Sequence, residues 1–160
     1  MPGHRTPKRK HREPKRRTRL ETKPTDALAI LKLFEIRSEE RMRQARAWFF
    51  TEFQPKSGLE ILALMQSGEK SSAYYRMVSS HWETAAALVN NGGIDEKMFL
   101  EANTEYLVVF AKLQPFITEI RETIGEPDYL AQLERLVMKA ENVEKKLENR
   151  RRLIERWTNK

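Results

Sequence analysis

The stretch that most constrains the fold of this 160-residue chain is residues 90–95, which read Asn-Asn-Gly-Gly-Ile-Asp. It stands between two segments whose apolar residues recur at helical spacing. Either glycine can adopt the left-handed conformation that ends a helix, and the carboxylate of Asp95 can cap the helix that follows. The pattern predicts an αα-hairpin whose two helices cover residues 71–91 and 95–113.

The rest of the chain has helical periodicity too. Residues 27–36 are mostly apolar and predict a buried helix of about three turns. Ser57 is followed three residues later by Glu60, which has the form of a capping box at the start of a helix. Pro115 is expected to kink or restart the helix in which it lies. We therefore expect an all-α bundle of five to seven helices around the central αα-hairpin.

The longest predicted helix covers residues 128–158 at the C-terminal end of the bundle. Its apolar residues alternate at spacings of three and four, which is typical of a heptad seam. The seam either packs on the bundle or projects from it. A projecting seam would bind a second copy of the chain, forming a homodimer, or another protein. The self-association candidates are Leu133, Leu136, Val143, Leu147, Ile154 and Trp157.

Residues 1–24 differ from the rest of the chain in charge. They hold ten Lys or Arg and two Glu, a net charge of +8, whereas residues 25–160 have a net charge of −1. The segment also has four prolines and few large apolar residues, so burial cannot offset the entropy of ordering it. We expect a disordered basic tail over 1–24 and a single helical domain over 25–160.

The basic tail is expected to contact nucleic acid, either RNA or DNA, or another polyanion. Clustered Lys and Arg side chains neutralise phosphates and release counterions. The tail has no aromatic residue to stack on bases, so such binding would be indifferent to nucleotide sequence. The alternatives are a tail that only keeps the chain in solution, a contact with an anionic membrane, and a nuclear-import signal. The polyanion-binding candidates are Lys8, Arg9, Lys10, Arg12, Lys15, Arg16, Arg17 and Arg19.

The sequence predicts no catalytic residue, metal site or cofactor. It has no cysteine, which excludes disulfides, thiol nucleophiles and cysteine-ligated metals. It also lacks a phosphate-binding glycine loop, a serine-centred nucleophile motif and a Glu-x-x-His pair. No apolar run is long enough for a membrane span or a signal peptide. We expect a non-enzymatic binding or scaffold protein of the cytoplasm.

The alternative is a small-ligand binder or enzyme with a pocket between helices 71–91 and 95–113. His81 is the one histidine within the helical region, although a lone histidine on an apolar stripe is more typical of a core residue. Glu101 and Glu105 are four residues apart and share a helix face, which is more typical of solvated carboxylates than of a site.

Glu83 and Arg121 are expected to form a structural ion pair. If the two arms of the hairpin pack antiparallel, the two side chains can reach each other. A buried carboxylate is tolerable only when it has a partner. We therefore expect this pair to support the fold rather than to act in catalysis.

Several short runs in and after the hairpin resemble an uncharacterised bacterial all-helical family, known as domain of unknown function 4760. These runs are His81–Glu83, Ala87–Glu96, Leu113–Ile117 and Ile120–Glu122. The resemblance covers roughly residues 27–136 and implies a helical fold without an established activity. Many members of that family carry a membrane-spanning helix ahead of the domain. This chain has a basic segment there instead, and residues 27–36 are too few and too interrupted to span a bilayer.

Overall fold

The computed structural model describes residues 19–158, with side chains from Pro24 onward. This part of the chain forms eight helices and no strand, so the all-α prediction is confirmed with one helix more than the largest number expected. The helices are α1 (Arg19–Ser38), α2 (Glu40–Thr51), α3 (Gly58–Gln66), α4 (Lys70–Asn90), α5 (Glu96–Ala102), α6 (Glu105–Ile124), α7 (Ala131–Met138) and α8 (Val143–Thr158).

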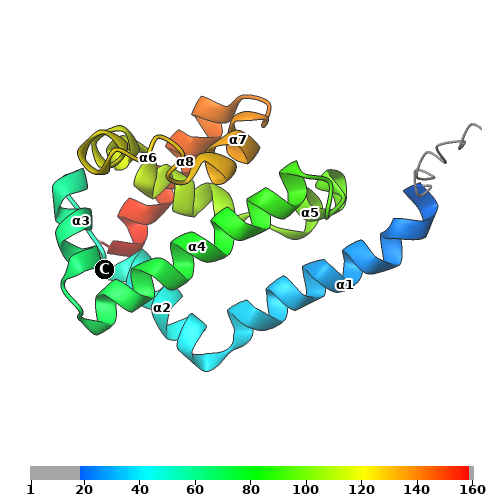
Figure 1. The fold of residues 1–160 in the computed structure, drawn as a ribbon, viewed down its shortest axis with the longest axis horizontal. Coiled ribbons are helices and arrows are strands. Elements are labelled where there is room, and N and C mark those ends of the chain that lie inside the picture. The colour runs from blue at the N-terminus through cyan, green and yellow to red at the C-terminus, as the bar shows by residue number, and fades with distance from the viewer. Residues whose placement is uncertain (1–18, 159–160) are drawn as a thin grey trace, which may run out of the picture.

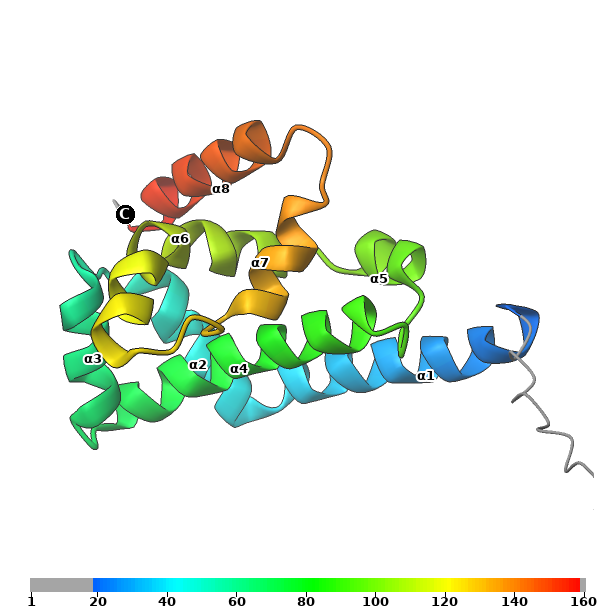
Figure 2. The same cartoon turned by 45° about the horizontal axis from the view of Figure 1, so that its top comes forward.

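Helix α4 is the centre of the bundle. Its most extensive contacts are with α2 and α7, while α6 packs on α8 and α3 (Figure 1). Helix α1 forms one edge of the molecule, and its N-terminal end extends past α5 in both views (Figures 1 and 2). Its main contacts are with α2 and α5. One side of α1 therefore faces away from the bundle.

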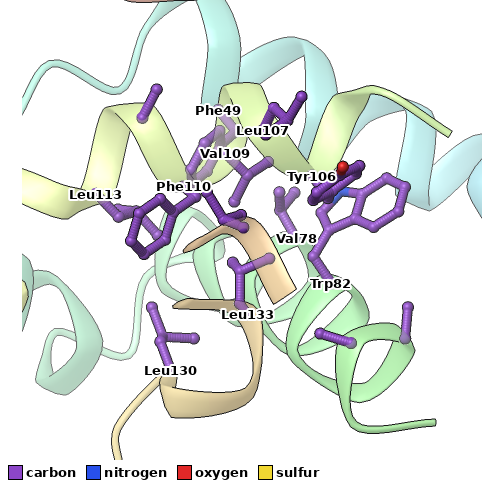
Figure 3. Packing of buried hydrophobic residues seen from close by; sticks show 14 of the residues in the cluster. Phe49, Val78, Trp82, Tyr106, Leu107, Val109, Phe110, Leu113, Leu130 and Leu133 are labelled. Atoms are coloured by element: carbon purple, nitrogen blue, oxygen red, sulfur yellow. The ribbon is translucent and has the colours of Figure 1, made fainter. Parts of the chain in front are cut away.

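The core lies where α4, α6 and α7 converge. Figure 3 shows Val78 and Trp82 of α4 facing Phe110 of α6 and Leu133 of α7. Trp82, Phe110 and Leu133 are fully buried, and Phe49 of α2 closes the far side of the cluster. Burial of each such side chain contributes about 1.5–3 kcal/mol. These aromatic side chains fill the centre of the domain, as their helical spacing predicts.

The turn after α4 is formed as predicted. Gly92 has a φ of 74°, a conformation that glycine adopts without strain. Asp95 caps α5 by accepting a hydrogen bond from the backbone N–H of Met98 at 2.9 Å. The predicted end of one helix and start of the next at this turn are therefore confirmed.

The second arm of the hairpin is two helices instead of one helix over 95–113. Helix α5 ends at Asn103, whose backbone is extended and whose buried side-chain amide donates to the carbonyl of Phe99 at 3.1 Å. Pro115 lies inside α6, whose ribbon bends midway along its length (Figure 2). The expected kink is present, and the helix continues beyond it.

The predicted C-terminal helix over 128–158 is also two helices. Residues 139–142 separate α7 from α8, and Asn142 in this loop has a φ of 53°. Asparagine enters the left-handed region more readily than most residues because its short polar side chain bonds locally. The chain then turns back, and α8 packs on α6 and α2. The seam thus belongs to the domain itself.

The N-terminal boundary of the helical domain is earlier than predicted. Helix α1 begins at Arg19 and includes Pro24, so residues 19–24 are helical rather than part of a disordered tail. The polyanion-binding candidates other than Arg19 lie within residues 1–18, which are outside the described residues.

Candidate interaction surface on helix α1

The outer side of α1 carries three large apolar side chains that are each more than half exposed. Leu28 is 66% exposed, Leu31 is 62% exposed and Phe34 is 58% exposed. They recur every three residues and so lie along one side of the helix. The predicted helix over residues 27–36 is therefore present, but the prediction that it is buried is wrong for its outer side.

The inner side of α1 is attached to the bundle by apolar side chains and by one buried carboxylate, and Ala29 and Ile30 are among the apolar residues that pack against the core. Leu33 is buried in the core cluster. Asp26 is also buried, and its carboxylate accepts a hydrogen bond from the backbone N–H of Asp95 at 3.2 Å. These residues are seven apart, which places them on the same side of the helix and away from Leu31. The outer side is thus held toward solvent.

A cluster of charges fixes the C-terminal end of α1. Glu105 at the start of α6 accepts two hydrogen bonds from the Nε of Arg46, at 2.9 and 3.0 Å, and pairs with its Nη2. Arg37 of α1 has its Nη1 3.8 Å from the same carboxylate, and Trp82 donates its indole N–H to it at 3.3 Å. Glu105 therefore joins α1, α2, α4 and α6. Glu101 lies on α5, is exposed and pairs with Lys97, so these two carboxylates do not form a site.

His81 lies beside this cluster and is buried. Its ring packs edge-on against Trp82 with centroids 4.9 Å apart, and its Nε2 has no hydrogen-bond partner. Burial lowers its pKa to about 4, with a further lowering by Arg37 that Glu105 only partly offsets. The imidazole is neutral at pH 7, and no carboxylate orients it. It is a core residue, as the sequence favours.

A shallow groove of about 330 Å³ opens beside His81, between α1, α2 and α4. Leu33, Ile36, Met42 and Met77 make it mostly apolar, and Glu39 lies among the polar residues that also line it. No group of three or more His, Asp or Glu side chains in the described residues is arranged to hold a metal ion.

The predicted pocket between the hairpin arms is filled by side chains. The rings of Trp82, Phe99 and Tyr106 pack against one another there, with centroids 5.7–6.4 Å apart. All three side chains are buried. These three rings therefore occupy space between α4 and the helices α5 and α6.

Glu83 and Arg121 do not pair, which corrects the prediction. The carboxylate of Glu83 accepts hydrogen bonds from the backbone N–H groups of Gln132 at 3.0 Å and Leu133 at 2.8 Å, and so caps the start of α7. Arg121 donates to the carbonyl of Tyr129 at 2.9 Å and to Glu134 at 2.7 Å. Both side chains hold the same segment, and neither binds the other.

The self-association candidates of the C-terminal segment are used inside the domain. Leu133, Leu136, Leu147 and Ile154 are buried, and Val143 packs against the core. Trp157 is 39% exposed, and its ring meets Phe50 of α2 edge-on at 5.8 Å. These contacts bind α7 and α8 to their own bundle and leave no free seam.

Lys112 is a buried charge that the sequence analysis missed. Its Nζ donates to the carbonyl of Phe49 at 2.7 Å, near the end of α2 where carbonyls lack helical partners. Burial lowers its pKa to about 8. Its burial could have been inferred from its position as a single lysine in the apolar run of residues 106–113.

Searches of curated proteins and of solved structures found no match. Among residues 19–158, no helix combines the length and the apolar character needed to cross a membrane. A family model described as Domain of unknown function (DUF4760) matches residues 23–140, which include α1 through α7 almost completely. Since this match covers most of the chain, the protein belongs to the DUF4760 family.

Proposed function

We propose that this protein is a non-enzymatic scaffold that docks a protein through the outer side of α1 and contacts nucleic acid or another polyanion through its basic N-terminal residues. The observation that carries the proposal is the exposure of Leu28, Leu31 and Phe34, each more than half exposed, on a helix that directly follows the basic run. The proposal includes a cytoplasmic location.

The outer side of α1 is suited to docking because its exposed apolar side chains lie next to one another along the helix surface. A single exposed leucine is ordinary, but a contiguous apolar strip on a helix is typical of a surface that another protein covers. Helical anchors at this spacing also recur where a helix lies in an apolar groove.

The basic residues before α1 support the polyanion part of the proposal. Residues 1–24 have a net charge of +8, while the remainder of the chain is nearly neutral. Attraction to phosphates would therefore be concentrated at one end of the protein. Such binding weakens steeply with salt because condensed counterions are released.

The non-enzymatic part is supported by the structural roles of three buried or partly buried ionisable groups. Glu105 binds Arg46 and Trp82, Lys112 caps α2, and Glu83 caps α7. Each group is occupied by a contact that holds helices together.

The experiment compares RNA and duplex DNA binding by the full chain and by a variant in which seven basic tail residues are replaced by Gln. For the full chain, log K against log salt is expected to fall with a slope of up to about −7 on duplex DNA if some eight phosphates are neutralised. The variant is expected to lose binding with an unchanged melting temperature. The replaced residues are Lys8, Arg9, Lys10, Arg12, Lys15, Arg16 and Arg17.

The matched control replaces seven exposed basic residues of the helical domain by Gln and so removes the same charge. This control is expected to retain most of the binding. Equal loss in both variants would contradict the tail as the binding segment. The control residues are Arg41, Arg43, Lys56, Lys97, Lys145, Lys146 and Arg156.

A further inference from the structure

We infer that the outer side of α1 is covered by α1 of a second copy of this chain, packed antiparallel across a two-fold axis near Leu31. The inference rests on the docking role proposed for α1 and names its partner. It also moves self-association away from the C-terminal helices, whose apolar residues are used internally.

The strip is neutral, which fits a second copy of itself. Lys32 and Glu35 lie among the exposed apolar residues and pair with each other at 3.0 Å. Leu28, Leu31 and Phe34 can then meet an identical strip without burying an unpaired charge. A two-fold interface requires such self-complementarity, because the same patch faces itself.

Charge along the chain selects the antiparallel arrangement. A parallel pair would place the two basic N-terminal segments, each with a net charge of +8 over residues 1–24, beside each other. An antiparallel pair sets them at opposite ends and so avoids this repulsion between like charges. The antiparallel arrangement is therefore favoured.

The register follows from the positions of the apolar residues. With the axis at Leu31, this residue meets Leu31 of a second copy, and Leu28 lies opposite Phe34 of the second copy. A one-residue shift would rotate these pairs away from each other, because successive helical residues are about 100° apart.

The position of α1 leaves room for this partner. The helix forms an edge of the molecule, and its N-terminal end extends beyond α5 (Figures 1 and 2). Three apolar residues on each side make a smaller interface than the roughly 800 Å² per partner of a stable complex. The dimer is thus expected to depend on concentration, with the mass rising from 18.9 kDa toward twice that value.

The natural chain has no cysteine, so single cysteines can test the register by mild oxidation of the full chain. Leu31→Cys is expected to form a covalent dimer alone, since facing Cα atoms near the axis come within disulfide reach. Leu28→Cys is expected to cross-link with Phe34→Cys when the two variants are mixed, and not with itself. Leu59→Cys is the control, because Leu59 is 56% exposed on α3, far from α1 in sequence.

Sedimentation gives the second measurement. Leu31→Glu places two carboxylates at the axis and is expected to abolish the dimer, while Leu59→Glu leaves it unchanged. Both side chains are more than half exposed, so neither substitution disturbs the core. Circular dichroism of each variant verifies the fold.

Three results of the mass and cross-linking measurements would overturn the inference. They are a mass of 18.9 kDa at every concentration, self-cross-linking of Leu28→Cys as efficient as that of Leu31→Cys, and cross-linking of Leu59→Cys at the same rate. Capture of the monomer by anionic vesicles, lost in Leu31→Glu, would also overturn it in favour of lipid. None of these measurements uses a polyanion, so they test the dimer separately from the tail. A monomeric protein that still binds RNA through its tail would refute the dimer but not the proposed role of the tail.

Discussion

At the scale of single residues, His81 makes the stability of this protein depend on pH. Burial lowers its pKa to about 4, with Arg37 adding to the effect, and an unfolded histidine titrates near 6.5. Between these values the unfolded state binds more protons than the folded state. The free energy of unfolding should therefore fall as the pH drops through this window and be unaffected by His81 above about pH 7.

We predict that His81 lowers the free energy of unfolding by about 2 kcal/mol between pH 7.5 and pH 5. His81→Leu removes the titrating group and should remove this part of the pH dependence. Urea unfolding of both proteins at the two pH values measures it. Carboxylates titrate in both proteins and cancel in the comparison. Parallel pH profiles for the two proteins would show that the histidine is protonated as easily in the folded state as in the unfolded one.

At the scale of elements, α7 depends on a cap supplied by another helix. Glu83 of α4 accepts from two backbone N–H groups at the start of α7, where Leu130 offers no side-chain cap. Hydrogen bonds to a charged group contribute about 1.5–3 kcal/mol. We predict that Glu83→Ala lowers the free energy of unfolding by about 3 kcal/mol and Glu83→Gln by less. Hydrogen exchange of Gln132 and Leu133 should increase, whereas Glu101→Ala, on an exposed carboxylate, should change neither quantity.

Elements whose signals are local were predictable from the sequence, and those that depend on distant residues were not. Ser57 accepts from the N–H of Glu60 at 3.1 Å and Asp95 accepts from Met98, both within one turn. The cap on α7 joins residues about fifty positions apart, so periodicity cannot reveal it. The break at residues 139–142 was missed because the heptad spacing continues across it. The exposure of α1 was missed because an apolar run does not specify how many of its sides are covered.

At the scale of the whole molecule, Glu105 is the point where α1, α2, α4 and α6 are tied together. Its side chain is 13% exposed and serves Arg46, Arg37 and Trp82 at once. Removing the carboxylate leaves two guanidinium groups close together without a counter-charge. Loss of one partner of a buried ion pair typically costs 3–5 kcal/mol, and partial exposure of Arg46 should reduce this.

We predict that Glu105→Gln lowers the free energy of unfolding by about 3 kcal/mol. Because Arg37 is the polar attachment at the C-terminal end of α1, hydrogen exchange in α1 should increase more than in α4. Combining Glu105→Gln with Arg46→Met should cost less than the sum of the single changes, since the second change removes a charge that the first left unpaired. Strict additivity would mean that the cluster does not hold the helices as a unit. An unchanged exchange rate in α1 would show that Asp26 and the apolar contacts of Ala29, Ile30 and Leu33 hold the helix on the bundle without the charge cluster.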